Sequence, residues 1–353
     1  MPLPVVFRAA RVALAVSAFT AVAPAADHPE GESPVDHLPA YIRRLTAFGE
    51  RPDWSADGKK ILFLSKTFGD AMEYDLATGA ITNRTAHFPH HGFARALYLS
   101  NGDIVLTGPQ AFDPKNPGRA RRECYLYILD KSGKKPAVPL GVLCNEGPAI
   151  SRRRPHLAWT EWSDPKPGET LSGSKMFEGD IVYTDGVPAI VNRQLILDGA
   201  DLGFRATMET QNFRPPEEKE MTFSAYSGGG QKCDVMMIDL ATKKFTNLTH
   251  SPELYDEPEG IYPDGKYTLV EHDGAHPGGI GRIDLWRLKL DGSGEYIRLT
   301  HFADYPGYKC SNPVVSDDGK FIAFQMGHSG EAAGVGHGIF VYDLTKAPNG
   351  ETP

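Results

Sequence analysis

The sequence lacks several features that would assign a function directly. It has no long basic run, and acidic side chains outnumber basic ones by 45 to 37, which gives a net charge of −8. An acidic chain without a basic tract is poorly suited to nucleic acid, so no nucleic-acid partner is expected. It also contains no Gly-x-Ser-x-Gly elbow, no His-Glu-x-x-His motif and no dinucleotide-binding fingerprint. These absences argue against the commonest serine hydrolases, zinc proteases and nucleotide-cofactor enzymes.

Long apolar runs are also scarce. The apolar run at 12–22 follows two arginines and precedes Ala23-Pro-Ala25. A charged start, an apolar run too short to span a bilayer and a small-residue cleavage site are typical of a secretory signal peptide. We therefore expect a signal peptide over 1–26, with cleavage after Ala25 or Ala26. The expected product is periplasmic or secreted and has no membrane span.

Only four cysteines occur in the chain. Cys124 and Cys144 flank a predicted hairpin that turns at 131–134, so a cross-strand disulfide between them is one expectation in an oxidising compartment. Cys233 and Cys310 have no local partner. Four cysteines allow three pairings, and the sequence does not choose among them.

What the sequence does contain is a repeat. Ser-Ala-Asp-Gly-Lys at 55–59 and Ser-Asp-Asp-Gly-Lys at 316–320 each precede an apolar stretch. Tyr-Ile-Arg-Arg-Leu-Thr at 41–46 reappears as Tyr-Ile-Arg-Leu-Thr at 296–300. Six repeats of roughly 40–55 residues, each with short strands and tight turns, predict an all-β, six-bladed β-propeller of four-stranded blades.

The ends of the chain predict how the ring closes. The sixth repeat stops after its third strand, at Leu344, and the matching fourth strand is the segment 41–46. We expect this N-terminal strand to complete the last blade, because closure removes an exposed sheet edge. The expected organisation is a short tail over 27–40, a propeller over 41–348 and a C-terminal tail over 349–353, in a monomer.

The repeat signature resembles a known family. It reads Pro52-Asp-Trp-Ser-Ala-Asp-Gly-Lys59 in the first repeat and Pro313-Val-Val-Ser-Asp-Asp-Gly-Lys320 in the last. This pattern resembles the TolB-like, WD40-like (PD40) propeller family over nearly the whole mature chain. The resemblance implies the architecture and says little about function, because one fold carries many activities.

One face of the predicted ring is chemically richer than the other. Blade-to-blade links and loops between second and third strands gather there, with nine of the twelve histidines. Side chains that precede each innermost strand should enter the central channel. The expected ligand face consists of His90, Glu146, Glu209, Glu257, Asn312, His328 and His337.

One loop on that face carries a sharper motif, His272-Asp-Gly-Ala-His276 followed by Arg282. Two imidazoles on a Gly-rich loop could bind a metal or act as a base, and a guanidinium could bind a carboxylate. The spacing resembles oligogalacturonate lyases, which are also propellers. That resemblance implies His276 as the proton-abstracting base and Arg282 as the uronate-binding group. The lyases have a metal-ligand histidine where this chain has Asn312.

Two functions remain open from the sequence. The first is a binding module that captures a protein or a glycan on its long-loop face through aromatic and arginine side chains. The alternative is an enzyme acting on acidic carbohydrate, as a polysaccharide lyase or a glycoside hydrolase. For the enzyme, Arg95 would assist Arg282 with the carboxylate, and His272 and His91 would be metal ligands or orienting groups. No cofactor is certain, and a divalent metal remains open.

Overall fold

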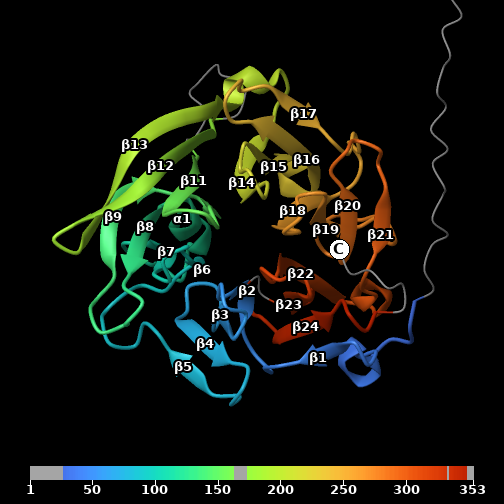
Figure 1. Ribbon diagram of the computed structural model, residues 1–353. Helices are drawn as coiled ribbons and strands as arrows, with labels where there is room; N and C mark the ends of the chain where they lie inside the picture. Colours follow the sequence, from blue (N-terminus) through green and yellow to red (C-terminus); the bar gives the residue numbers. More distant parts are fainter. Residues whose placement is uncertain (1–26, 163–172, 332–333, 348–353) are drawn as a thin grey trace, which may run out of the picture.

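The computed structural model describes residues 27–162, 173–331 and 334–347, which form six four-stranded antiparallel sheets arranged in a ring (Figure 1). The predicted all-β, six-bladed propeller is confirmed. The predicted signal peptide and the C-terminal tail over 349–353 lie outside the described residues.

Each blade runs from an innermost strand near the axis to an outermost strand at the rim. Blade 1 contains β2 (Glu50–Trp54), β3 (Lys60–Leu64), β4 (Ala71–Asp75) and β5 (Ile81–Asn83). Blade 2 contains β6 (Arg95–Tyr98), β7 (Ile104–Pro109), β8 (Cys124–Leu129) and β9 (Val138–Leu143). Blade 3 contains β10 (Ala149–Ile150), β11 (His156–Glu161), β12 (Lys175–Thr184) and β13 (Val187–Asp198).

The second half of the ring follows the same order. Blade 4 contains β14 (Thr207–Phe213), β15 (Glu220–Ser227), β16 (Lys232–Asp239) and β17 (Phe245–Asn247). Blade 5 contains β18 (Asp256–Ile261), β19 (Tyr267–His272), β20 (Asp284–Lys289) and β21 (Tyr296–Arg298). Blade 6 contains β22 (Tyr308–Val315), β23 (Phe321–His328), β24 (Ile339–Asp343) and β1 (Ile42–Arg44).

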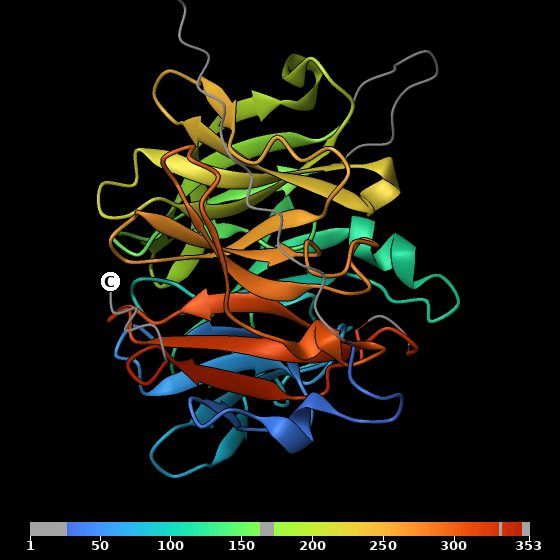
Figure 2. The same ribbon diagram turned by 90° about the vertical axis from the view of Figure 1, so that its right-hand side faces the viewer.

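Among the described residues, helix is confined to short pieces. One α-helix, α1 (Pro117–Arg122), lies in a connection expected from the sequence to be a loop, and it projects from one face of the disc (Figure 2, teal). The 3-10 turns are η1 (Pro34–His37), η2 (Gly199–Leu202), η3 (Gly228–Gly230) and η4 (Phe302–Asp304). None of the helices in the described part of the chain has the length and apolarity needed to cross a bilayer.

The repeated turn has one geometry in the first and last blades. The Ser55 hydroxyl donates to Asp57 Oδ1 at 2.8 Å, and the backbone N–H of Lys59 donates to the same oxygen at 3.1 Å. Ser316, Asp318 and Lys320 make the same two bonds at 2.7 and 3.1 Å. The glycine in each turn has a left-handed φ, 66° and 72°, a conformation that L side chains adopt at a cost. The sequence repeat is therefore a turn that hydrogen-bonds itself.

Apolar side chains fill the space between neighbouring blades. Leu285 of blade 5 belongs to the same buried cluster as Phe324 and Phe340 of blade 6. Fully burying a side chain of this size stabilises a fold by roughly 1.5–3 kcal/mol. The core is thus a set of inter-blade layers, which leaves the axis to polar side chains.

The ring closes as the sequence predicted. β1 pairs with β24, so that Ile42 lies opposite Tyr342 and Arg44 opposite Phe340. The first blade is also joined to the last, because the Trp54 indole N–H donates to the Val314 carbonyl at 3.1 Å. Strands from both ends of the propeller therefore share blade 6.

Blade 3 departs from the expected pattern. The sequence pattern of apolar and polar residues indicates a third strand over 180–184. In the structure β12 begins at Lys175, and β13 is 12 residues long. The hairpin contacts blade 2, where the Tyr183 hydroxyl donates to Asp103 Oδ2 at 2.5 Å. The far end of this hairpin thus ties blade 3 to blade 2.

The expected Cys124–Cys144 disulfide is wrong. All four cysteines have free thiols and are buried. The backbone N–H of Cys144 donates to the Cys124 carbonyl at 2.9 Å, so the two residues face each other on adjacent strands. A disulfide requires a particular dihedral between the two sulfurs, and directly paired strands rarely provide it.

Candidate functional site

The innermost strands aim polar side chains at the axis by the same backbone device. Arg51, Glu146 and Asn312 each have a left-handed φ, of 55°, 62° and 50°. Such values are uncommon for residues other than glycine. A register shift in the strand pair redirects the side chains near it. Four innermost strands carry one, between Glu50 and Asp53, Thr210 and Asn212, Pro258 and Gly260, and Ser311 and Val314.

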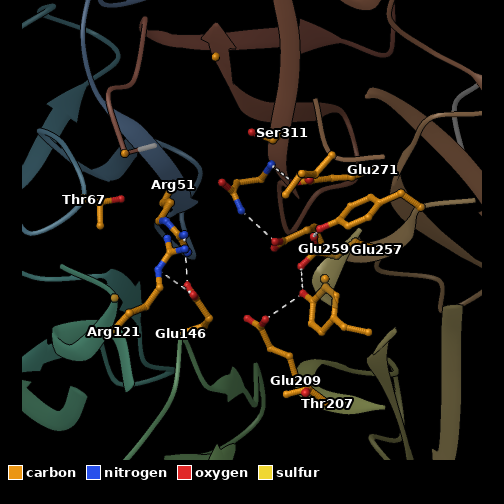
Figure 3. Close-up of a pocket in the computed structure, with 18 of the residues that line it drawn as sticks. Arg51, Thr67, Arg121, Glu146, Thr207, Glu209, Glu257, Glu259, Glu271 and Ser311 are labelled. Carbon is orange, nitrogen blue, oxygen red and sulfur yellow. Dashed lines mark hydrogen bonds and ion pairs between the residues drawn. The ribbon is translucent and has the colours of Figure 1, made fainter. Parts of the chain in front are cut away.

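These side chains line a cavity of about 1350 Å³ at one end of the axis (Figure 3). Its wall also includes the loops between second and third strands, among them 228–230 and 327–331, so the cavity lies on the long-loop side of the ring. Trp162 lines it as well, held by an indole N–H bond to the Met208 carbonyl at 2.9 Å. The cavity is large enough for a small ligand.

One wall of the cavity is a hydrogen-bonded chain of carboxyl and phenol groups. The Tyr226 hydroxyl lies 2.9 Å from Glu209 Oε2 and also within hydrogen-bond distance of Glu257 Oε1. The Tyr255 hydroxyl bonds the other Glu257 oxygen. A phenol has only one proton to donate, so it cannot serve two carboxylates. A proton on Glu209 or Glu257, donated to Tyr226, would satisfy both contacts.

The electrostatics of this wall agree with the shared proton. Burial, followed by the charge of Glu259, raises the pKa of Glu257 to about 7. Burial and the neighbouring carboxylates hold the pKa of Glu209 well above its usual value. Glu271 is buried beside the same charges, and its pKa is also raised well above normal. At neutral pH the wall is thus only partly ionised.

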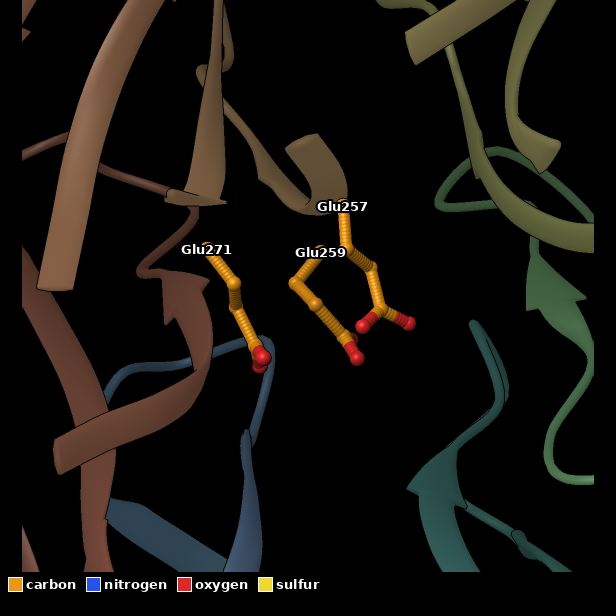
Figure 4. Close-up of side chains that lie close together, drawn as sticks. All are labelled: Glu257, Glu259 and Glu271. Carbon is orange, nitrogen blue, oxygen red and sulfur yellow. The ribbon is translucent and has the colours of Figure 1, made fainter. Parts of the chain in front are cut away.

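Three of these glutamates approach one another closely. Glu257, Glu259 and Glu271 each offer a carboxylate oxygen, and the three oxygens lie within 4.8 Å of one another (Figure 4). Asn312 holds two of them, because its side-chain N–H donates to Glu259 at 2.8 Å and its backbone N–H to Glu271 at 2.6 Å. An all-oxygen set of this kind could hold a hard divalent cation such as Ca²⁺.

The opposite wall is held by arginines (Figure 3). Arg51 Nη2 lies 3.2 Å from Glu146 Oε2, and Arg121 Nε lies 2.9 Å from Glu146 Oε1. Burial opposes ionisation of Glu146, but Arg121 and Arg51 outweigh it, and the pKa of this carboxyl is lowered. Glu146 is therefore a fixed negative charge that keeps two guanidinium groups in place. The cavity has hydrogen-bond donors on one side and carboxyl groups on the other.

Six of the residues expected at the site line the cavity: Arg95, Glu146, Glu209, Glu257, Asn312 and His328. These six residues come from five different blades and lie in or near the strands that border the axis, as the repeat pattern suggested. Arg95 lies between the acidic residues, with Nη2 3.5 Å from Glu259 and 4.0 Å from Glu209.

The loop with the lyase-like spacing touches the cavity wall through Ile280 and Gly281, but its His276 and Arg282 side chains do not. His276 Nε2 is bonded to Asp304 Oδ1 at 2.8 Å, and its other ring nitrogen lies 3.7 Å from Asp27. The Arg282 guanidinium donates to the Ala303 carbonyl at 2.6 Å and also bonds Asp27. Both side chains therefore already have partners within the chain, and neither lines the cavity.

The remaining expected residues are scattered. The His272 ring lies against the Asp256 carboxylate and stacks on Tyr296, with ring centroids 4.9 Å apart. His90 bonds Asp70 at 3.1 Å, and His91 is exposed beside it. His337 bonds Glu331 at 3.0 Å. Within the described ranges, one group of three side chains is placed to hold a metal, and it contains neither His272 nor His91.

Sequence reasoning missed Tyr226, Tyr255, Glu259, Glu271 and Arg121. Glu259 is two residues beyond Glu257 on β18, and Glu271, next to last in the neighbouring β19, lies directly across from Glu257. Alternation along paired strands could have found these two. Tyr226 lies near the end of the second strand of blade 4, and Arg121 lies in α1. No local sequence pattern predicts that these two side chains reach the cavity.

Comparison with known proteins shows the fold. No protein-family model and no curated protein matches the sequence. Among solved structures, a gluconolactonase from Xanthomonas campestris is 13% identical, with 86% of this chain and 88% of that chain covered and a TM-score of 0.54. An oligogalacturonate lyase from Vibrio parahaemolyticus is 14% identical, with 86% and 80% covered and a TM-score of 0.50.

TolB from Acinetobacter baumannii is 18% identical, with 84% of this chain covered and a TM-score of 0.47. This chain spans 66% of the length of that protein. The resemblance to TolB-like propellers and to oligogalacturonate lyases that the sequence suggested is thus present among solved structures. The gluconolactonase and the lyase have different names but a similar fold, so this likeness shows the fold alone.

Proposed function

We propose that this protein is an exported glycan-binding propeller that holds a short oligosaccharide in its central cavity. The observation that carries the proposal is the cavity itself. Arginine donors on one wall, carboxyl and phenol groups on the other and an indole at its edge converge on a single space of about 1350 Å³.

A polyhydroxylated ligand fits this combination of groups. Each sugar hydroxyl both donates and accepts, so it can satisfy a carboxyl oxygen and a guanidinium N–H together. The partly ionised carboxyl wall suits a neutral or weakly charged ligand better than a strong anion. Trp162 supplies an apolar surface with a polar edge, on which a sugar ring can stack. The predicted signal peptide agrees with a glycan met in the periplasm or outside the cell.

The first experiment is isothermal titration of the protein without its predicted leader. The ligands are neutral and uronate-containing di- to pentasaccharides, each tested with and without Ca²⁺. We expect Glu257→Gln and Arg51→Lys to weaken binding by about tenfold or more, because each breaks contacts in a desolvated site. Glu217→Gln is the matched control, since Glu217 is an exposed glutamate outside the cavity wall. No heat with any sugar, or equal loss in the control, would contradict the proposal.

A second candidate, glycoside hydrolysis, is favoured by the proton shared between Glu209 and Glu257 beside Glu259. A protonated carboxyl next to a carboxylate is the pairing this reaction uses. The lyase alternative would need His276 and Arg282, whose contacts lie elsewhere. Product analysis after incubation with the bound oligosaccharide distinguishes these functions. Hydrolysis gives a new reducing end, elimination gives an unsaturated sugar absorbing in the ultraviolet, and pure binding returns the ligand unchanged.

A further inference from the structure

The passage along the propeller axis is interrupted below the main cavity. A second cavity of about 70 Å³ lies beyond it, and the two cavities have four lining residues in common: Arg95, Glu209, Glu259 and Asn312. These residues come from blades 2, 4, 5 and 6. They form a layer across the axis, which we call the floor.

Direct contacts hold the floor together. Arg95 Nη2 reaches Glu259 at 3.5 Å and Glu209 at 4.0 Å, and Asn312 Nδ2 donates to Glu259 at 2.8 Å. All three charged side chains are at most 10% exposed. A buried charge cluster of this kind resists opening, because separating the ions would leave them desolvated and unpaired.

A second ion-pair bridge lies beyond the floor. Arg152 Nη2 is 3.2 Å from Asp53 Oδ1, and Arg152 Nε is 3.6 Å from Asp317 Oδ1. Arg152 and Asp53 line the smaller cavity. The bridge joins blade 3 to blades 1 and 6. Together with the floor it closes the passage on that side.

Arg95 holds its place in the floor because residue 147 is glycine. A Cβ added to Gly147 would lie 2.8 Å from Arg95 Cγ and 2.9 Å from Arg95 Nε, closer than real Cβ contacts. Any side chain at position 147 would therefore displace the guanidinium. Gly147 is a positioning residue, and Arg95 is the cation that a ligand reaching the floor would meet.

From this closure we infer that the cavity recognises the end of a glycan chain, with Arg95 as the residue that contacts the terminal sugar. The inference rests on the proposed function and specifies its ligand. A chain that enters from the long-loop side stops at the floor, so only its terminal unit can fill the deepest part. An internal stretch would have to leave through the opposite side, where the floor and the Arg152 bridge block it.

The test uses the unaltered protein and the oligosaccharide with the highest affinity in the titration. That sugar is compared with versions capped by a bulky group at the non-reducing end, at the reducing end or at both. We expect one cap to weaken binding by about 100-fold or more, and the other to change it less than about threefold. Equal affinity of the doubly capped sugar would overturn end recognition while leaving glycan binding intact. Failure of every uncapped sugar to bind would overturn both.

Gly147→Ala tests the role of Arg95 without changing a charge. We expect it to weaken binding of the uncapped sugar by about tenfold or more. Gly278→Ala is the control, because its added Cβ would have one neighbour, at 3.9 Å, and Gly278 lies outside the cavity wall. Unchanged affinity in folded Gly147→Ala would refute the role given to Arg95. If this variant does not fold, Arg95→Lys and the capped sugars decide the question.

Discussion

At the scale of single residues, the most consequential feature is the proton that Glu209, Tyr226 and Glu257 share. The geometry favours one protonated carboxyl, because a single phenol hydrogen serves only one carboxylate well. Burial next to Glu259 gives Glu257 a pKa of about 7, compared with an ordinary value of 4.5. The folded protein therefore takes up a proton that the unfolded chain releases.

This uptake predicts a pH-dependent stability with a definite sign. Between pH 4.5 and 7 the native state holds more protons at Glu257 than the unfolded state does, so stability falls as pH rises through this window. Glu257→Gln removes the ionisable group. At each pH we compare the free energy of unfolding of this variant with that of the wild type. We expect the difference to shift in favour of the variant by about 3 kcal/mol between pH 4.5 and pH 8.

Urea denaturation of both proteins at several pH values measures this difference. Glu217→Gln, on an exposed side chain, should follow the wild-type curve throughout. The difference in free energy of unfolding between the wild type and Glu257→Gln could also stay constant with pH. That result would show that Glu257 is ionised in the folded protein at acid pH, contrary to the shared-proton arrangement.

The site was predictable only where position in the repeat decides it. Arg95, Glu146 and Asn312 could be placed at the axis because turn residues mark where each innermost strand begins. The carboxyl wall could not be foreseen as a unit, since Glu209 and Tyr226 belong to blade 4 and meet Glu257 of blade 5 only when the two blades stand side by side. The disulfide failed for a related reason: sequence spacing placed Cys124 opposite Cys144 but did not give the orientation of their side chains.

At the scale of elements, the register shifts in the innermost strands make this cavity polar. An unbroken strand would alternate its side chains regularly between the two blade interfaces. At Asn312, a φ of 50° breaks the alternation and lets one residue bond both Glu259 and Glu271. The shifts were not visible in the sequence, because asparagine, glutamate and arginine all occupy the left-handed positions.

This backbone conformation predicts an order of stability among Asn312 variants. Asn312→Gly keeps the left-handed φ at no steric cost and loses only the side-chain bond, whereas Asn312→Ala loses the bond and strains the backbone as well. We expect the alanine variant to be less stable than the glycine variant by about 1 kcal/mol, as measured by thermal or urea unfolding. The reverse order would mean that residue 312 is not left-handed in solution.

The accuracy of the predicted strand boundaries varied from strand to strand. β8 was placed correctly at both ends, whereas β12 was predicted five residues too short at its start. Gly179 and the register shift between Glu178 and Asp180 interrupt the strand pattern there. Tertiary pairing with β11 and β13 overrides that weak local signal.

At the scale of the whole molecule, the ring depends on β1. This strand lies at the start of the propeller and completes the blade that the last strands build, so contacts distant in sequence hold the circle closed. Ile42 is 6% exposed in this strand, and Ile81 of β5, in the equivalent outer position of blade 1, is 39% exposed.

The contrast yields a matched pair of variants. Ile42→Asp places a charge in the inter-blade core and should lower the free energy of unfolding by at least about 3 kcal/mol. Ile81→Asp should change it by no more than about 0.5 kcal/mol, because that side chain already meets water. Calorimetry of both proteins measures the difference. Similar losses of unfolding free energy in the two variants would show that β1 contributes no more to stability than the outermost strand of blade 1.

The four buried thiols, none of which forms a disulfide, determine the redox conditions under which the protein can fold. No covalent cross-link between cysteines has to form for the ring to close. Folding therefore needs neither an oxidant nor a disulfide isomerase, and the redox potential of the surroundings should not affect it. A reducing agent should leave the melting temperature unchanged, and protein refolded under reducing conditions should match protein refolded under oxidising conditions.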